Sequence, residues 1–388
     1  MPAAESHRVI ERALLGYIVV VVVLLTLAPF RFVWPTHWII DWWGDSRDAP
    51  SNFLLFLPVG YFFRLSLPGG QRRAPWWALL FGGALSFAIE TLQLFLPERL
   101  TSLWDLLSDS VGAAAGAVLC GAVRRRFDRM LPAGLTLEHP LLNLVYLIVP
   151  LMWLTGVGVE TEPARVWLLA PLGAMGALTL SGLWRHRYAV VAAMPRPALA
   201  VLVLGWFLFG AVTGLSYGPL VVAQCAAGIF VLTMTRLYLG RSPVGLDRRF
   251  EQRVLASVWP CFVIYLLMLV GWPLPHAYAP FDYAVGYPEI HFDRNFTLRI
   301  AEQLGALTLF GYLLAESRGR RRLPSRRLLG MSMMWGACCA LMMEFAHGLL
   351  PGDRASLLRW GLGSLGAAFG VSLYVAQMNV VQVLRGRT

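Results

Sequence analysis

The sequence predicts an all-α fold, a polytopic bundle of about twelve transmembrane helices whose two termini lie on the cytoplasmic side. Three observations predict it. Hydrophobic residues make up 57% of the 388 residues and charged residues only 14%, whereas soluble domains carry about 25% charged residues. Apolar stretches long enough to cross a bilayer recur along the whole chain. Basic residues gather in every second connection between these stretches, which indicates a consistent orientation in a membrane.

Twelve stretches have the apolar content of a membrane helix, which needs about 20 residues. They are residues 13–33, 50–66, 76–96, 103–123, 141–159, 166–184, 198–215, 218–236, 254–273, 299–316, 328–350 and 357–380. The apolar run of the first stretch continues without a small-residue cleavage site. We therefore expect an uncleaved membrane helix there and no signal peptide.

The distribution of arginine predicts the orientation. All 33 basic side chains are arginines, and they cluster after the second, fourth, sixth, eighth and tenth stretches and at the C-terminus. The alternate connections hold acidic groups such as Asp41, Asp45, Glu160 and Glu162. Because positively charged loops stay in the cytoplasm, the even-numbered connections and both termini are predicted to lie inside. The same loops account for the formal net charge of +11, so we expect no nucleic-acid partner.

The sequence contains an internal duplication, whose clearest part aligns without gaps at a shift of 254 residues and whose earlier part aligns at a shift of 251. Residues 90–116 match residues 344–370 at ten of twenty-seven positions, and Gly60-Tyr61 recurs as Gly311-Tyr312. An even number of stretches separates the copies, so they are expected to be parallel repeats. We therefore predict two parallel four-helix repeats flanking a four-helix middle block. The expected domains are residues 1–130, a four-helix membrane domain; 137–245, a central four-helix block; and 250–388, a diverged second repeat.

The third and fourth stretches carry acidic residues at membrane depth, where a charge costs about 2.5–3.5 kcal/mol and needs a reason. Glu90 lies seven residues before Pro97 at the expected outer end of its helix, and Asp109 lies at nearly the same depth. Two such carboxyl groups do not both ionise easily, so one can hold a proton. We predict that Glu90 and Asp109 are catalytic or bind an ion. Substrate-binding residues predicted around them are Asp48, Asn52, Gln93, Arg99 and Asp105.

Spacing places these acids on a helix face that is directed into the bundle. Asp105, Asp109, Gly112, Gly116 and Cys120 follow one another at steps of four, three, four and four residues. The small residues of this stripe allow close contact with a neighbouring helix. The acidic end is then expected to line an outward-facing polar pocket. The alternative is a hydrogen-bonded network that ties the helices together without any ligand.

The motifs resemble a known family. The run from Asn52 to Gly60, the pattern Glu90-x-x-Gln93 followed by Pro97-x-Arg99, and the pattern Asp105-x-x-x-Asp109-x-x-Gly112 together resemble the VanZ-like family over the first four stretches. The resemblance implies a small multi-helix membrane domain of the cell envelope. The name-giving member lowers susceptibility to teicoplanin, a glycopeptide antibiotic, and relatives occur beside exopolysaccharide functions. No settled reaction is implied. This sequence departs from the family at Glu98, where glycine is usual.

The second copy keeps the pattern of small residues but loses much of the chemistry. Its counterparts of the signature residues are Glu344, His347, Arg354 and Arg359. Arg359 replaces an aspartate of the first copy, and Gly363 replaces the other. We predict that Glu344 pairs with Arg359 in a structural role, because buried charges need partners.

The sequence thus predicts a multi-pass protein of the bacterial cytoplasmic (inner) membrane. We expect its outer pocket to bind or modify a membrane lipid or a lipid-linked glycan head group, in glycopeptide resistance or in exopolysaccharide and envelope biogenesis. Two alternatives stay open, a secondary transporter built of two parallel repeats and a non-catalytic surface resistance or scaffold protein.

The sequence leaves open whether the protein catalyses a reaction. No metal or other cofactor is expected, since the histidines lack ligand spacing, and no nucleotide, since Walker and GxGxxG patterns are missing. Protein partners and oligomeric state are not predicted.

Overall fold

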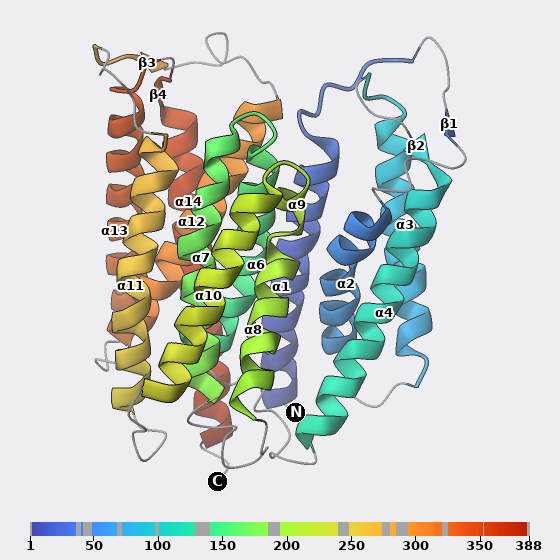
Figure 1. The fold of residues 1–388 in the computed structure, drawn as a ribbon, viewed down its shortest axis with the longest axis horizontal. Helices are drawn as coiled ribbons and strands as arrows, with labels where there is room; N and C mark the ends of the chain where they lie inside the picture. The colour runs from blue at the N-terminus through green and yellow to red at the C-terminus, as the bar shows by residue number, and fades with distance from the viewer. Residues whose placement is uncertain are drawn as a thin grey trace. The chain divides into compact units, whose positions relative to one another are not determined.

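The computed structural model describes most of the chain as helices (Figure 1). The described residues are 2–35, 40–41, 49–67, 72–97, 101–128, 140–184, 195–239, 248–273, 280–284, 294–319, 325–351 and 353–385. The chain divides into two compact units. Unit 1 contains residues 1–133 and 376–388, and unit 2 contains residues 134–375. Each unit is described by itself below.

Unit 1 consists mainly of four helices and one short parallel bridge. The helices are α1 (Pro2–Leu27), α2 (Ala49–Ser66), α3 (Ala74–Gln93) and α4 (Leu103–Asp128). Strand β1 (Ile40–Asp41) pairs in parallel with β2 (Thr101–Ser102), which immediately precedes α4. This pairing fixes the connection between α3 and α4, where the predicted acidic residues lie.

Helices α2 and α4 approach until their backbones touch. A Cβ atom at Gly60 of α2 would overlap the carbonyl oxygen of Ala113, and one at Gly116 of α4 would overlap that of Leu57. Gly112 lies equally close to the backbone of Phe53. The small-residue stripe of α4 therefore contacts a neighbouring helix, as its spacing predicts, and that neighbour is α2.

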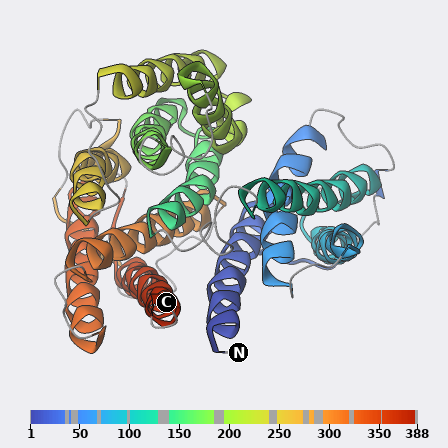
Figure 2. The same ribbon diagram turned by 90° about the horizontal axis from the view of Figure 1, so that it is seen from below.

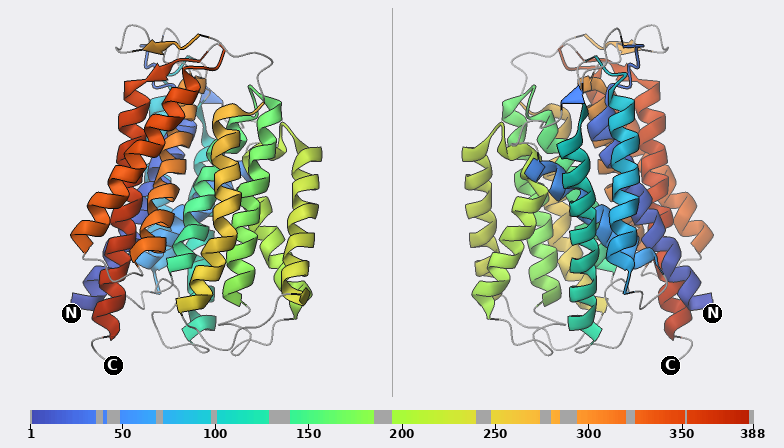
Figure 3. Two further views of the ribbon diagram at one scale, coloured as in Figure 1. Left: turned by 90° about the vertical axis from the view of Figure 1, so that its left-hand side faces the viewer. Right: turned by 90° about the vertical axis from the view of Figure 1, so that its right-hand side faces the viewer.

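Unit 2 contains the remaining helices and a second parallel bridge. Its elements are α6 (Pro140–Gly158), the 3-10 helix η1 (Pro163–Leu168), α7 (Leu169–Leu183), α8 (Arg196–Gly210), α9 (Val212–Leu215), α10 (Pro219–Leu239), α11 (Arg248–Gly271), α12 (Arg294–Gly319), α13 (Ser325–His347) and α14 (Leu357–Arg385), whose last residues belong to unit 1. Strand β3 (Tyr283–Ala284) pairs with β4 (Ala355–Ser356) at one end of the helices (Figures 1 and 3).

The core of unit 2 is built around α6. This helix packs against both α7 and α12, as the view from below shows (Figure 2). Trp153 of α6 is fully buried, and its indole Nε1 donates a hydrogen bond to the carbonyl oxygen of Phe209, 3.2 Å away. The bond satisfies the one polar atom of a large apolar side chain, so the residue can occupy the centre of the unit.

Eight helical segments in the described part of the chain are long and apolar enough to cross a membrane. They are Val9–Leu27, Leu103–Arg125, Leu141–Gly158, Pro163–Leu183, Pro219–Leu239, Glu251–Gly271, Arg326–His347 and Leu357–Asn379. The other four predicted stretches are helical as well, in α2, α3, α8 and α12. Helix α8 is only 15 residues long, and α12 carries several charged residues. Whether these four cross the membrane stays a prediction.

The contact between α2 and α4 predicts the effect of one added methyl group. Gly116→Ala should destabilise the protein by about 1–3 kcal/mol, because the methyl group enters space that the α2 backbone occupies. Gly16→Ala on the exposed side of α1 is the matched control, since no atom lies within 4 Å of its added Cβ. Thermal unfolding of both variants in detergent measures the difference. Equal unfolding temperatures would contradict the close contact.

Candidate functional site

Glu90 lies in the last turn of α3, and its side chain is buried. The backbone N–H of Ser102 donates a hydrogen bond of 2.8 Å to its Oε2 atom. The hydroxyl of Thr101 donates a second bond, of 3.0 Å, to the backbone carbonyl of Glu90. Both donors belong to β2, so the glutamate fastens the end of α3 to the residues that begin α4.

Asp109 is buried one and a half turns into α4. The hydroxyl of Ser86 in α3 donates a 2.7 Å hydrogen bond to its Oδ2 atom. Its other oxygen, Oδ1, is buried and accepts no hydrogen bond from the residues that the structure describes. An unsatisfied buried polar atom costs about 1–3 kcal/mol. Asp109 therefore offers an acceptor that a proton, a cation or a ligand hydroxyl would satisfy.

The acids of α3 and α4 form one electrostatic group. Asp105 lies half-buried in the first turn of α4 and interacts electrostatically with both Glu90 and Asp109. Glu90 and Asp109 interact with each other as well. In the described part of the chain, neither of these two forms an ion pair with a cationic side chain. Such a group favours a shared proton or a bound cation, because neighbouring buried carboxylates resist joint ionisation.

The other predicted residues of the first repeat are dispersed. The amide Nε2 of Gln93 donates a 3.2 Å hydrogen bond to the carbonyl oxygen of Thr26 at the end of α1. Asn52 is half-buried in the first turn of α2. Asp48 and Arg99 lie outside the described residues. The structure thus gathers the three acids, while Gln93 links the end of α3 to α1.

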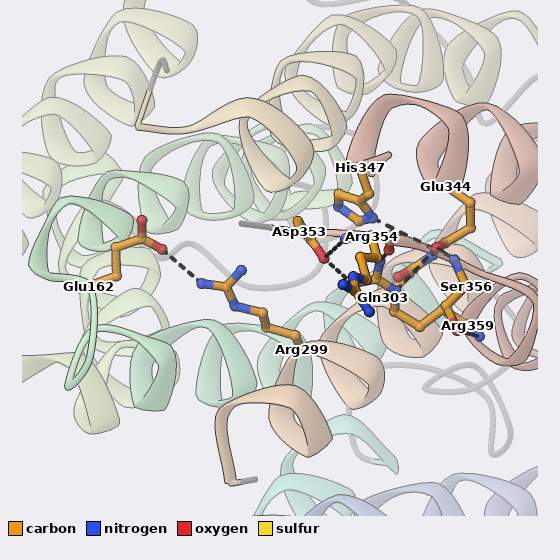
Figure 4. Close-up of polar contacts among 9 residues, drawn as sticks. All are labelled: Glu162, Arg299, Gln303, Glu344, His347, Asp353, Arg354, Ser356 and Arg359. Atoms are coloured by element: carbon orange, nitrogen blue, oxygen red, sulfur yellow. Dashed lines mark hydrogen bonds and ion pairs between the residues drawn. The ribbon is translucent and has the colours of Figure 1, made fainter. Parts of the chain in front are cut away.

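Glu344, the expected counterpart of Glu90, lies at the end of α13 in unit 2 (Figure 4). The backbone N–H of Ser356 donates a hydrogen bond of 2.9 Å to the Oε2 atom of Glu344, just as the N–H of Ser102 does to Glu90 in unit 1. Here, however, the guanidinium Nε of Arg359 donates to the same oxygen at 3.1 Å, and both side chains are buried. The amide Nε2 of Gln303 donates a hydrogen bond of 2.7 Å to the other carboxylate oxygen, Oε1 of Glu344. The predicted ion pair of Glu344 with Arg359 is confirmed.

Arg359 extends this pair into a network. Its Nη1 atom lies 3.1 Å from Oδ1 of Asp353, and its Nη2 donates to the carbonyl oxygen of Arg354. The guanidinium of Arg354 is half-exposed and pairs with Asp282 at 2.8 Å. His347 places Nδ1 at 3.6 Å from Oε1 of Glu344. Glu344 is therefore neutralised by a cation, unlike Glu90 in unit 1.

A second buried ion pair was not predicted. Nη2 of Arg165 in η1 lies 2.6 Å from Oε2 of Glu302 in α12, and both side chains are buried. The hydroxyl of Thr155 donates a further 2.6 Å hydrogen bond to Glu302. The signal for this acid was its place inside the predicted stretch 299–316. Nothing in the sequence indicates that Arg165, from a distant connection, would meet it.

The described residues contain no group of three or more histidine, cysteine, aspartate or glutamate side chains placed to hold a metal ion. Acid–base chemistry, cation binding and hydrogen bonding to a polar head group are what the carboxyl groups of unit 1 are suited to.

Comparison with known families agrees with the signature residues. Residues 5–124 match the model of the VanZ/LLP1 family. The match spans the helices α1 to α4 and less than a third of the 388 residues. No curated protein and no solved structure matches the chain. With eight helical segments in its described part long and apolar enough to cross a bilayer, the chain is a membrane protein whose residues 5–124 are similar to the VanZ/LLP1 family.

Proposed function

We propose that the chain is an integral protein of the bacterial cytoplasmic membrane whose VanZ-like unit receives a head group from the outer side. The head group belongs to a membrane lipid or a lipid-linked glycan. The arginine-rich connections support an orientation with both termini in the cytoplasm. That orientation places the connection between α3 and α4 outside. A role in glycopeptide resistance or in exopolysaccharide and envelope biogenesis follows from the family resemblance.

The burial of Glu90 and Asp109 beside purely neutral hydrogen-bond donors is the observation that carries this proposal. Ser102 and Ser86 are those donors. Burying a carboxylate without a cation is unfavourable, so such groups inside a membrane protein usually serve a function. In unit 2 the corresponding Glu344 is neutralised by Arg359. The contrast favours a working acid pair in unit 1.

Each residue then has a role. Glu90 and Asp109 exchange a proton with the head group or hold its counter-cation. Asn52, Gln93 and Asp105 orient its hydroxyl groups, and Arg99 meets its phosphate or carboxylate, since a guanidinium binds both well.

We further propose that residues 250–388 are the diverged second copy of this unit, within a chain of twelve spans. Equivalent contacts support it. An added Cβ at Gly311 or Gly370 would overlap the carbonyl oxygen of Ala367 or Thr308. In unit 1 an added Cβ at Gly60 or Gly116 would likewise overlap that of Ala113 or Leu57. The strand pairs β1–β2 and β3–β4 are both parallel. The second copy serves as structure, because its Glu344 is already neutralised by Arg359.

The acid pair predicts a loss of function from two amide substitutions. Glu90→Gln and Asp109→Asn should each lower activity by about 10²-fold or more, as expected for removal of a general acid or base. The measurement is complementation of teicoplanin tolerance in a strain lacking the gene, with the protein quantified in the membrane fraction. Glu160→Gln, which removes a half-exposed acid of unit 2, serves as the control. Full complementation by both amide variants at normal expression would refute the proposal.

The structural role of the second copy predicts a difference between two arginines. Arg359→Ala should destabilise the protein by about 3–5 kcal/mol, because it leaves the buried carboxylate of Glu344 without a cation. Arg354→Ala removes the half-exposed pair with Asp282 and should cost less than about 1 kcal/mol. The double variant Glu344→Gln/Arg359→Gln should recover most of the loss. Thermal unfolding in detergent measures all three, and equal effects of the two single variants would contradict the assignment.

A further inference from the structure

Unit 2 contains a cavity of about 260 Å³ outside the VanZ-like residues. Its walls come from η1, the end of α11, α12, α13, the connection before β4, and α14. Drug-sized ligands occupy cavities of about 300–1,000 Å³. This smaller volume suits a single compact group. Arg299, one of the lining residues, exposes 46% of its side chain and marks the mouth.

Three arginines and three acids line the polar side of this cavity, and each arginine is paired within the wall. Arg165 pairs with Glu302 at 2.6 Å, Arg359 with Asp353 at 3.1 Å and Arg299 with Glu162 at 3.3 Å. Figure 4 shows the pairs of Arg299 and Arg359. The charges of the wall therefore cancel. A ligand with a net charge would have to break one of these pairs before it could form its own.

The wall nevertheless retains unused hydrogen-bonding capacity. A guanidinium has five N–H donors and a carboxylate about four acceptor positions, and the pair of Arg299 with Glu162 uses one of each. His347 also lines the cavity, but its Nδ1 lies 3.6 Å from Oε1 of Glu344, so the arginines and acids of the wall supply most of this capacity. Hydrogen-bond donors and acceptors held beside one another can bind hydroxyl groups, because each hydroxyl both donates and accepts hydrogen bonds.

The cavity also has apolar lining residues. They include Leu269, Trp272, Met343 and Leu350. The indole Nε1 of Trp272 donates a 2.9 Å hydrogen bond to the carbonyl oxygen of Ala164, which holds the ring in place. A fixed aromatic side chain offers a large contact area at little entropic cost. The C–H face of a sugar ring can pack on such a surface while its hydroxyl groups face the charged wall.

We propose that this cavity binds one neutral sugar unit, either free or as the head group of a glycolipid. The proposal goes beyond the function proposed for unit 1 and does not depend on Glu90 or Asp109. It follows from the juxtaposition of a charge-balanced array of donors and acceptors with a fixed indole in a cavity of this volume.

The test titrates the full-length protein in a detergent without sugar, such as lauryldimethylamine oxide, and measures binding by isothermal titration calorimetry. The probes are methyl β-D-glucopyranoside, octyl β-D-glucopyranoside below its micellar concentration, and octyl phosphate. We expect both glucosides to bind and octyl phosphate to bind at least tenfold more weakly. Tighter binding of the octyl than of the methyl glucoside identifies a glycolipid, and equal affinities identify a free sugar.

Arg299→Gln should weaken glucoside binding about tenfold or more, because it removes charged donors at the mouth. Arg294→Gln is the matched control. Arg294 lies on the same helix and pairs with the neighbouring acid Glu160, but it does not line the cavity. Its variant should bind as the native protein does. Leu350→Trp, at a half-buried position, should fill the cavity and abolish binding without altering any charge.

Three results would overturn the inference. One is the absence of glucoside binding, and another is a preference for octyl phosphate. The third is binding that Arg299→Gln and Leu350→Trp leave unchanged. If Glu90→Gln alone abolished glucoside binding, the sugar site would lie in unit 1, which would refute this inference and favour the proposed function. Loss of function in Glu90→Gln together with intact glucoside binding would support both.

Discussion

A buried carboxylate needs a partner, and for one glutamate in each unit that partner includes the backbone N–H of the serine that immediately precedes the next helix. Ser102 serves Glu90 in this way, and Ser356 serves Glu344. Each bond fixes where one helix ends and the next begins, so the depth of the acid and the path of the chain are set together. One hydrogen bond satisfies only part of a carboxylate's capacity. What completes it differs between the units, and that difference separates the acid group of unit 1 from the ionic network of unit 2.

The apolar runs of the sequence predicted where the helices lie, and every predicted stretch is helical. The length and composition of the helices satisfy the requirements for crossing a membrane in some of these stretches and not in others. The predicted stretch 198–215 is divided between α8 and the short α9, and α12 includes Glu302 and Glu316, which lower its mean hydropathy. A single sequence cannot show whether such a helix crosses the membrane, because burial against other helices shields charges that lipid would reject.

The candidate site was predictable where its residues are close in sequence. Glu90, Asp105 and Asp109 belong to two helices joined by a short connection, so their proximity follows from spacing alone. Glu344 and Arg359 are related in the same way. Arg165 and Glu302 are 137 residues apart, and no periodicity relates them. Their meeting depends on how α6, η1 and α12 pack, which is tertiary information. The cavity of unit 2 was invisible to sequence reasoning for the same reason.

The glycine contacts have a consequence for how the two halves can diverge. At Gly60, Gly116, Gly311 and Gly370 the space for a side chain is taken by the main chain of the facing helix. Any larger residue must push two helices apart, so only glycine is tolerated at these positions. The polar residues near the strand pairs are of different kinds in the two units, with Asp105 in the first turn of α4 and Arg359 in the first turn of α14. Under the proposed duplication, a copied unit can therefore acquire new chemistry while its framework stays fixed.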